Sequence, residues 1–314
     1  MTTKSARKSS ALLLLSFLTV FSVPAGLAAQ RLDIDLNVAA AVPVSAQASL
    51  NETLSFDFLS GENPLIRGNN LKLVLGQTLT PVSVAASFDA VLTPVAFLKL
   101  GAGVSFGSGW DIGIANGLGV NERLGLHGNQ VSTEPFIGLV TRVNFDAVFQ
   151  FDTAVLVPGE WNHLQFSTHH QFSYQSLSGI DDDTSWVYQG DDGGNRRGWG
   201  YSGSYYLGYQ MPIVLENIGL LVDTGLRLYQ TPGREMWGDD LMNVNFGPVL
   251  NFRLSGQTTL ALVTQFNTRL NFVGDTGSYG FYQDRIVDRA NPYHLEFNRV
   301  ALSLNTHVGD FGEL

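Results

Sequence analysis

The segment from Met242 to Phe272 alternates so regularly between apolar and polar residues that it restricts the chain to a β fold. Successive side chains of a strand point to opposite faces, so this period of two gives one apolar face and one polar face. Ser255, Gly256 and Gln257 interrupt the alternation with turn residues, which predicts a hairpin. The even positions carry Met242, Val244, Phe246, Pro248, Leu250, Phe252, Leu254, Leu260, Leu262, Thr264, Phe266, Thr268, Leu270 and Phe272. Alternation alone fits both a soluble sandwich, whose apolar face is internal, and a membrane barrel, whose apolar face meets lipid.

The N-terminal segment has the layout of a secretory signal peptide. Lys4, Arg7 and Lys8 precede an uncharged apolar run from Ala11 to Val23, and small residues suited to cleavage follow at 24–29. The apolar run is shorter than the ~20 residues that a membrane-spanning helix needs. We therefore expect residues 1–29 to be a signal peptide, cleaved after Ala28 or Ala29, and residues 30–314 to form one domain.

Composition narrows the class of the mature chain. It contains no cysteine, which excludes disulfides, thiolate metal sites and a lipidated N-terminal cysteine. Removing the leader leaves 15 Lys and Arg against 28 Asp and Glu, which argues against a nucleic-acid partner. No later segment is apolar enough for a membrane helix, so a membrane-embedded mature chain must be a closed barrel.

The alternation divides the mature chain into about 12 strands, an even number, as expected for bacterial antiparallel barrels. One phase holds from Ile137 to Val157, which predicts a single long strand there. The phase reverses at Thr80-Pro81, which we interpret as a tight turn. The expected strands are 32–42, 54–58, 71–79, 82–92, 98–106, 137–157, 164–174, 199–209, 218–228, 242–254, 260–272 and 300–308.

The connections between these strands alternate in length from about residue 93 onward. Short ones fall at 93–94, 158–162, 212–216 and 255–257, and long ones at 107–134, 177–198, 231–241 and 273–294. This predicts short turns at one end of a barrel and long loops at the other, with both termini on the short-turn side. The loop at 61–70 departs from the pattern, because it falls on the short-turn side.

These features together resemble a bacterial outer-membrane β-barrel of the porin-like kind, over nearly all of the mature chain but without a specific family motif. The resemblance implies an all-β, transmembrane, antiparallel up-and-down barrel in the bacterial outer membrane. Its expected partners are outer-membrane lipids, small polar solutes and the barrel-assembly machinery. Such barrels commonly end in an aromatic residue that this machinery reads, whereas this chain ends Asp310-Phe311-Gly312-Glu313-Leu314. The last aromatic residue, Phe311, is followed by three more residues, which either weakens the resemblance or implies a short tail after the last strand.

Charged residues in the polar phase would line the inside of such a barrel. Mixed charges on an inner wall either orient polar solutes in a wet channel or pair across the lumen and fill it. Side chains fill a barrel of about eight strands, and about 16–18 strands leave a channel, so about 12 leaves both interpretations open. The predicted pore-lining residues are Lys99, Arg142, Asp146, Asp152, Asp223, Arg227, Arg253, Arg269 and Arg299.

The connection from Gly107 to Glu134 is unusually apolar for a loop in water. We expect it either to fold into the barrel mouth and narrow the pore, or to extend the flanking strands above the membrane. Its apolar residues are Trp110, Ile112, Ile114, Leu118, Val120, Leu124 and Leu126.

The five tryptophans of the chain fall at strand ends or in loops, which suits an interfacial aromatic girdle. They are Trp110, Trp161, Trp186, Trp199 and Trp237.

The sequence favours a porin-like channel for passive diffusion of small polar solutes. One alternative is a plugged structural or adhesin-like barrel acting through its outer loops. Another is an outer-membrane lipid hydrolase, for which His169 and His170, near Ser167 and Ser173, are the only candidates. No G-x-S-x-G elbow is present, so we expect no catalytic residues and no enzyme. The aspartates at 181–183 and 191–192 lack the spacing of a calcium loop, so we expect no metal site and no cofactor.

Overall fold

The structure is a computed structural model that describes residues 31–42, 45–57, 61–63, 65–124, 128–182, 184–191, 193–230, 234–273 and 285–312. The signal peptide expected at residues 1–29 lies outside these ranges. So do Leu126, Asp183, Asp192 and the last two residues, Glu313 and Leu314.

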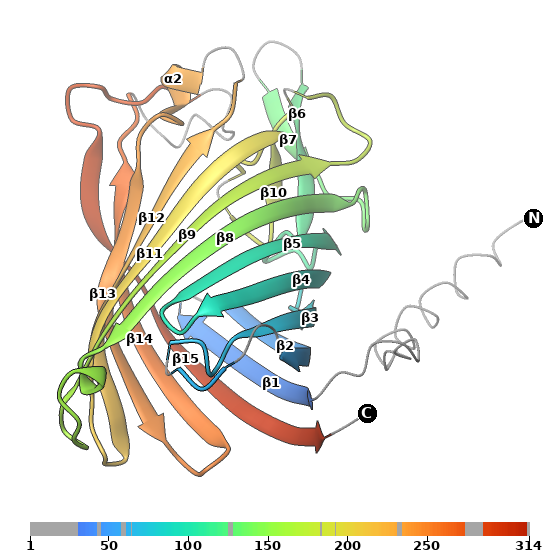
Figure 1. The fold of residues 1–314 in the computed structure, drawn as a ribbon. Coiled ribbons are helices and arrows are strands. Elements are labelled where there is room, and N and C mark those ends of the chain that lie inside the picture. Colours follow the sequence, from blue (N-terminus) through green and yellow to red (C-terminus); the bar gives the residue numbers. More distant parts are fainter. Residues whose placement is uncertain are drawn as a thin grey trace, which may run out of the picture.

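Twelve strands of the described chain form one closed antiparallel barrel (Figure 1). Each strand pairs with the barrel strand before it and the one after it, and Arg31 opposite Gly312 closes the cylinder. The expected all-β, up-and-down barrel is therefore confirmed. Its strands are β1 (Arg31–Val42), β2 (Ser45–Asp57), β3 (Asn70–Leu79), β4 (Ser83–Val95), β5 (Leu98–Gly109), β8 (Val140–Asp152), β9 (His163–Leu177), β11 (Gly198–Gln210), β12 (Leu215–Leu228), β13 (Asn243–Arg253), β14 (Thr258–Leu270) and β15 (Tyr293–Gly312).

The remaining elements lie in the connections. β6 (Leu118–Leu124), β7 (Gly128–Ser132) and β10 (Trp186–Tyr188) form a separate three-stranded sheet in the order β10-β6-β7. A 3₁₀ turn, η2, covers Thr153–Val155, and a single helical turn, α2, covers Arg234–Trp237. Among the described residues, no helix is long and apolar enough to cross a membrane.

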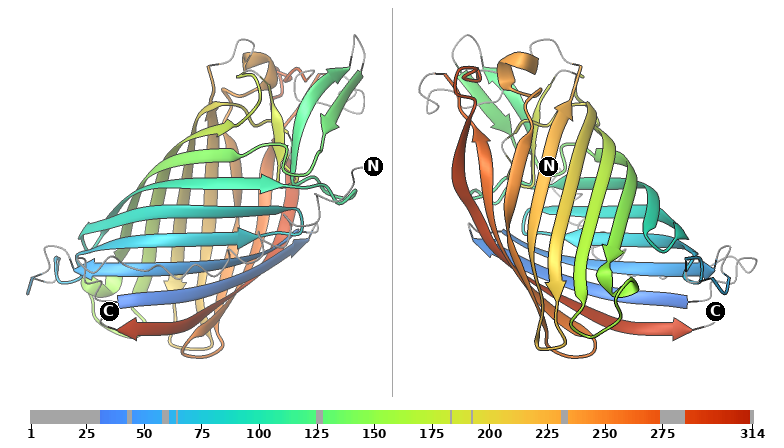
Figure 2. Two further views of the ribbon diagram at one scale, coloured as in Figure 1. Left: turned by 90° about the vertical axis from the view of Figure 1, so that its right-hand side faces the viewer. Right: turned by 60° about the vertical axis from the view of Figure 1, so that its left-hand side comes forward.

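The two ends of the barrel differ in the length of their connections (Figures 1 and 2). Both described termini lie at one end, which we call the turn end; its connections are 58–69, 96–97, 153–162, 211–214 and 254–257. The opposite end, which we call the loop end, has the connections 43–44, 80–82, 110–139, 178–197, 229–242 and 271–292. The predicted asymmetry from residue 93 onward is confirmed, and the 58–69 loop is its exception at the turn end.

Several strand boundaries differ from the sequence prediction. The strand expected over 137–157 ends at Asp152, because its carboxylate accepts a hydrogen bond from the backbone N–H of Ala154 (2.9 Å) and starts the 3₁₀ turn. β4 continues past Pro94 to Val95, with a register shift after Leu92. A proline lacks a backbone N–H and so removes one hydrogen bond of the ladder. At a register shift such as this one, the strand can continue past the proline. The turn predicted at Thr80-Pro81 is confirmed.

The barrel wall is one sheet thick, so among the described residues its outward-facing apolar side chains have no second sheet to pack against. Large apolar side chains such as Phe145, Phe172 and Leu207 are exposed on it. Phe246 and Phe266 stack at 6.0 Å across the β13–β14 hairpin, in the phase that alternation predicted. A soluble sandwich would bury this face between two sheets, and the described chain does not have that architecture.

Candidate solute pathway inside the barrel

The inner face of the wall is identified by polar contacts that skip a strand. Side chains on the concave side of a closed sheet converge, whereas those on the convex side diverge. Asn217 on β12 donates to Gln165 on β9 (2.7 Å), although β11 lies between these strands. Gln265 on β14 donates to Asp223 on β12 (3.3 Å) across β13. The polar phase of the alternation therefore faces the inside of the barrel.

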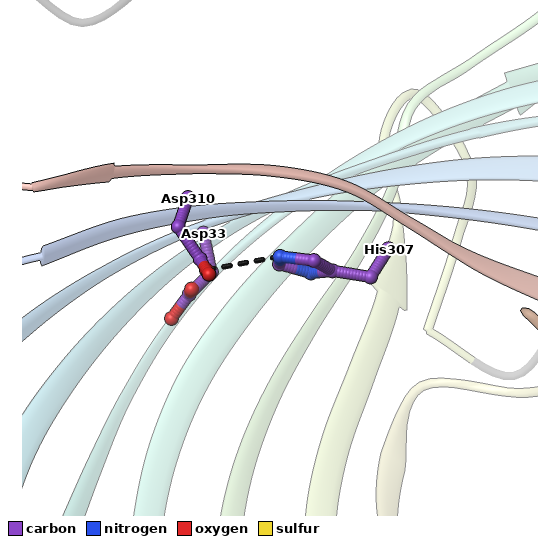
Figure 3. Close-up of side chains that lie close together, drawn as sticks. All are labelled: Asp33, His307 and Asp310. Atoms are coloured by element: carbon purple, nitrogen blue, oxygen red, sulfur yellow. Dashed lines mark ion pairs between the residues drawn. The ribbon is translucent and has the colours of Figure 1, made fainter. Parts of the chain in front are cut away.

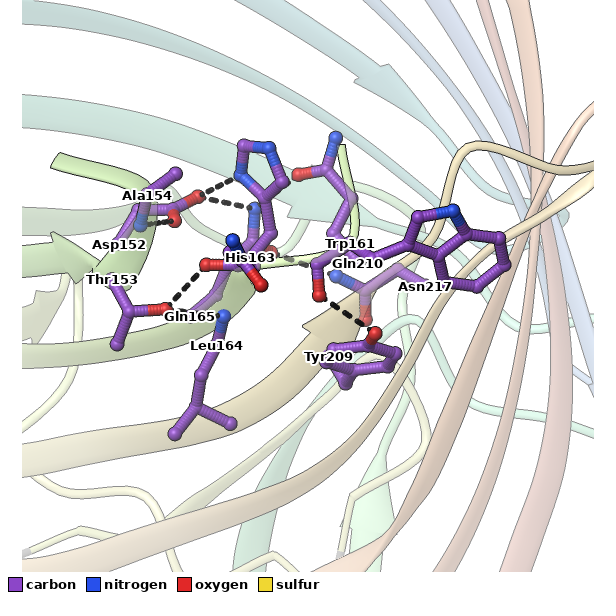
Figure 4. Close-up of polar contacts among 11 residues, drawn as sticks. Asp152, Thr153, Ala154, Trp161, His163, Leu164, Gln165, Tyr209, Gln210 and Asn217 are labelled. Carbon is purple, nitrogen blue, oxygen red and sulfur yellow. Dashed lines mark hydrogen bonds and ion pairs between the residues drawn. The ribbon is translucent and has the colours of Figure 1, made fainter. Parts of the chain in front are cut away.

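At the turn end, Asp152 and the amides beside it form a polar cluster on this inner face (Figure 4). The Asp152 carboxylate lies 3.0 Å from Nδ1 of His163, and Gln165 reaches the same carboxylate at 3.4 Å. Gln165 also donates to Gln210 at 2.5 Å. These side chains come from β8, β9 and β11, so the cluster connects three neighbouring strands.

Midway along the wall, Asp146 on β8 is surrounded by hydrogen-bond partners. Its carboxylate lies 2.8 Å from Nε2 of His169 and accepts from the amides of Gln171 (2.8 Å) and Asn144 (2.5 Å). A carboxylate taken out of bulk water needs such partners, because burial without them is costly. This arrangement fixes a negative group on the inner wall.

A second mid-wall network connects charges of opposite sign. Asp223 on β12 accepts from the Ser204 hydroxyl (2.7 Å) and from Gln265, whose oxygen in turn accepts from Nε of Arg299 (2.7 Å). The amide of Gln265 thus bridges an anion and a cation on strands that do not touch.

The other four predicted arginines have partners nearer the ends of the barrel. Arg142 donates to Gln175 (3.0 Å), and Arg227 lies 3.6 Å from Asp239. The remaining two form ion pairs, Arg253 with Glu216 and Arg269 with Glu296. The Asp239 side chain is fully buried in the 229–242 connection, so Arg227 ties that loop to the wall.

Lys99 on β5 shares the inner face with a second lysine, Lys72 on β3, because Lys72 pairs with Val91 and Val91 pairs with Gly101 in the phase of Lys99. The sequence reasoning omitted Lys72, although it lies in the polar phase between Leu71 and Leu73 and alternation alone could have placed it. It also omitted neutral partners such as Gln165, Gln175 and Gln265, because only charged residues were considered. All nine predicted residues occupy inward-facing positions, and their role in lining a pore stays a prediction.

At the loop end, an apolar cluster covers part of the inner rim. Its buried members, which we call the mouth cluster, are Leu118, Val120, Val140, Leu177 and Trp186. Val140 and Leu177 share the inward phase of Arg142 and Gln175, so Leu118 and Val120 pack on the inner face of the wall. The hydroxyl of Tyr188 lies directly against Gly107, so a larger residue there would force the Tyr188 side chain to move. Burial raises the pKa of the Tyr188 phenol, which keeps it neutral.

The long apolar connection packs partly against the inner face of the wall, and its outer part forms a separate small sheet, so it does not extend the flanking strands β5 and β8 as the second alternative had it. Its base folds inward through Leu118 and Val120, whereas the β6–β7 hairpin extends beyond the ends of the barrel strands (Figure 2). Gln189, just after β10, donates to the hydroxyl of Ser83 (3.0 Å) and ties the small sheet to β4. Whether this narrows a pore stays a prediction.

The 229–242 connection joins the same rim. The guanidinium of Arg196 lies 3.4 Å from the ring centroid of Trp237, a cation–π contact. Gln175 donates to the backbone oxygen of Arg196 (3.2 Å) and to the hydroxyl of Tyr229 (2.7 Å). Trp186 is buried in the loop packing, so the expectation of an interfacial girdle is wrong for it, whereas Trp161 and Trp199 are exposed and Trp237 is half-buried.

The two histidines considered for hydrolysis face opposite sides of the wall. His169 contacts Asp146 on the inside, whereas Nδ1 of His170 lies 2.8 Å from the Tyr201 hydroxyl on the outside. Ser167 and Ser173 share the inner phase, so they lie on the opposite face from His170. Of the described acidic-loop residues, Asp182 pairs with Arg197, and Asp191 accepts from the backbone N–H of Gly193 (3.0 Å).

One group of possible metal ligands was missed from the sequence. Asp33, His307 and Asp310 each place one ligand atom within 4.8 Å of the others (Figure 3). Strict alternation puts His307 and Asp310 on opposite faces, so no sequence period could have brought them together.

No protein-family model matches this chain, and no curated protein matches it. Among solved structures, it is similar to a NanC porin in a rhombohedral crystal form, at 8% identity over 90% of this chain and 100% of that one, with a TM-score of 0.40. It is also similar to CdiB from Acinetobacter baumannii, at 9% identity over 90% of this chain, with a TM-score of 0.37. This chain spans 60% of that CdiB chain. Neither similarity is close enough to assign a function.

Proposed function

We propose that this protein is an outer-membrane channel through which small polar solutes diffuse passively, without an enzymatic step. Two properties of the wall support placement in a membrane. It is a closed cylinder with no free strand edge, which is the only β architecture that satisfies every backbone group in lipid. Its outer face carries exposed apolar and aromatic side chains, which are suited to contact with lipid tails.

The channel proposal rests on the direction of the polar contacts on the inner wall, which run along the wall. The contacts described above between barrel strands join adjacent strands or strands with one between them, as in Asp146–His169 and Asn217–Gln165. Contacts of this kind run along the wall and hold the side chains against it. A lumen filled by its own side chains would instead depend on pairs that reach across it.

The same contacts favour a channel for solutes of either sign over a strongly selective one. Asp146 and Asp223 place acidic groups at mid-wall, and Arg299, Lys72 and Lys99 place basic groups on the same surface. Alternating charges on a wet wall orient polar solutes without holding one of them tightly. The proposed partners are therefore small polar solutes inside the barrel and outer-membrane lipids around it.

Conductance in planar lipid bilayers tests this proposal. Folded protein should insert and give discrete current steps that scale with salt concentration. A heat-unfolded sample at the same concentration is the control and should give none. Protein that is shown to be folded and inserted but carries no current would contradict the channel.

The plugged, surface-acting barrel is the second candidate, and the mouth cluster is the observation that favours it. Trp186 is 1% exposed and packs against the inner rim, and Arg227 holds the 229–242 connection through Asp239. Loops fixed in this way leave less of the mouth open. Silent but inserted protein, combined with adhesion of cells that display it, would support this candidate.

A further inference from the structure

The closing seam of the barrel, where β1 pairs with β15, gathers an imidazole and two carboxylates at one point. Asp33 comes from β1, and His307 and Asp310 come from β15 (Figure 3). Nε2 of His307 lies 2.9 Å from the Asp310 carboxylate, and the three ligand atoms lie within 4.8 Å of one another. Residues at opposite ends of the described chain thus meet in one small volume on the inner face, at the turn end.

A β-bulge creates this meeting. Ile34 pairs with Gly309 but Asp35 pairs with His307, so β15 carries one extra residue, Val308, at this position. In an unbroken strand, residues 307 and 310 would point to opposite faces. The bulge turns Asp310 to the side of His307, opposite Asp33. Bulges that redirect a side chain recur beside functional sites.

A further carboxylate orients the imidazole. Nδ1 of His307 lies 2.9 Å from the Asp35 carboxylate, on the other side of the ring from Asp310. When Nδ1–H donates to Asp35, Nε2 carries the lone pair on the side of Asp33 and Asp310. A carboxylate behind a histidine, with the second ring nitrogen facing further ligands, is the usual outer shell of a metal-bound histidine.

The charge at the seam matches a divalent cation. Asp33, Asp35 and Asp310 place three carboxylates around a single guanidinium, that of Arg31, which lies 2.6 Å from Asp33 and 3.0 Å from Asp310. With His307 neutral, as it must be to act as a metal ligand, this one cation leaves two negative charges uncompensated. The Arg31 side chain is 56% exposed and has room to turn into solvent, so it does not block a metal ion from the carboxylates.

We propose that Asp33, His307 and Asp310 bind a divalent transition-metal ion of the zinc class, with Asp35 as the residue that orients His307. One nitrogen and two oxygen donors suit zinc and its neighbours, whereas calcium and magnesium prefer all-oxygen sites. The ion connects β1 to β15 and stabilises the closed barrel by mass action. The site does not depend on whether the lumen conducts.

Calorimetric titration with Zn²⁺ tests the site directly. The folded protein in detergent is first stripped with a chelator, and Zn²⁺ should then bind at one ion per chain. His307→Ala and Asp33→Asn should each weaken binding at least tenfold, because each removes a ligand. Asp35→Asn should weaken it roughly 10–100-fold through the orientation of the imidazole.

Two matched variants separate a metal site from an ion-pair cluster. Arg31→Gln removes the competing cation, so it should leave Zn²⁺ affinity unchanged or raise it. His294→Ala removes another histidine of β15, one that lies 3.6 Å from Glu296 outside the seam, and should not change the affinity. Zn²⁺ affinity that is unaffected by His307→Ala, or no binding by the stripped wild-type protein, would overturn the proposal.

Wild-type protein alone provides a second measurement, which does not depend on whether the variants fold. Co²⁺ bound at the seam should give visible d–d absorption bands of a low-coordinate nitrogen and oxygen site, and Zn²⁺ should displace it. Zn²⁺ should also raise the unfolding temperature of the wild-type protein. Co²⁺ spectra identical to those of the hydrated ion would equally overturn the site.

Discussion

At the scale of single residues, the wall gives opposite surroundings to side chains that are close in sequence. On β14, Leu262 pairs with Leu250 and Leu302 in the apolar phase, whereas Asn267 pairs with Asn245 and Glu296 in the polar phase. The first side chain faces outward, toward the proposed lipid, and the second faces the lumen. A charge introduced at these two positions should therefore have very different consequences.

We predict that Leu262→Arg lowers the free energy of unfolding by about 2–4 kcal/mol, the range for a charge on the lipid face at mid-depth. Asn267→Arg should lower it by less than half as much, because the guanidinium stays in a polar lumen beside Glu296. Urea titration of both variants folded into lipid vesicles measures the difference. Equal losses would show that the two faces are assigned the wrong way round.

Single residues also show where prediction from sequence ends. The period of two puts Asp33 and His307 in the polar, inward phase of their strands, since it fixes the face of every residue in an unbroken strand. It could not place Asp310, because the extra residue at Val308 changes the phase without any mark in the sequence. The sequence prediction was also wrong at Pro94, which was expected in a connection after the strand but lies within β4.

At the scale of elements, the barrel strands were predictable and the loop packing was not. The hairpin of β13 and β14 follows from local periodicity and a turn, which the sequence contains in full. The mouth cluster instead pairs β6 with β10, where Val120 lies opposite Trp186. That pairing joins two short segments that are far apart in sequence and show no regular alternation of apolar and polar residues. Local periodicity therefore could not decide between the two alternatives for the 107–134 connection.

We predict that Trp186→Ala loosens the loop end and raises single-channel conductance. A buried tryptophan truncated to alanine typically costs ~3–5 kcal/mol, and here the loss falls on a small sheet outside the barrel wall. The barrel should therefore stay folded. Trp161→Ala, at the turn end where the side chain is 52% exposed, is the matched control and should conduct like the wild type. Unchanged conductance in a folded Trp186→Ala variant would mean that the mouth cluster lies away from the solute path.

At the scale of the whole molecule, a closed wall with an apolar exterior predicts a characteristic behaviour. We expect the protein to be recovered from the outer-membrane fraction and to need detergent for extraction. Unheated samples should migrate differently from boiled ones in electrophoresis, because the cylinder survives detergent until it is heated. Recovery as a soluble periplasmic monomer would contradict the placement in lipid.

The seam between β1 and β15 also determines the order in which the molecule can be made. Every other junction of the wall joins strands that follow one another in the barrel order, so hairpins can add one at a time. Arg31 and Gly312 meet only after the chain between them is laid down, so closure joins strands from the two ends of the described chain. Until then, the growing sheet has two unsatisfied edges, which invite pairing with other chains. Closure is therefore the step at which a folding catalyst that shields free edges would have the most effect.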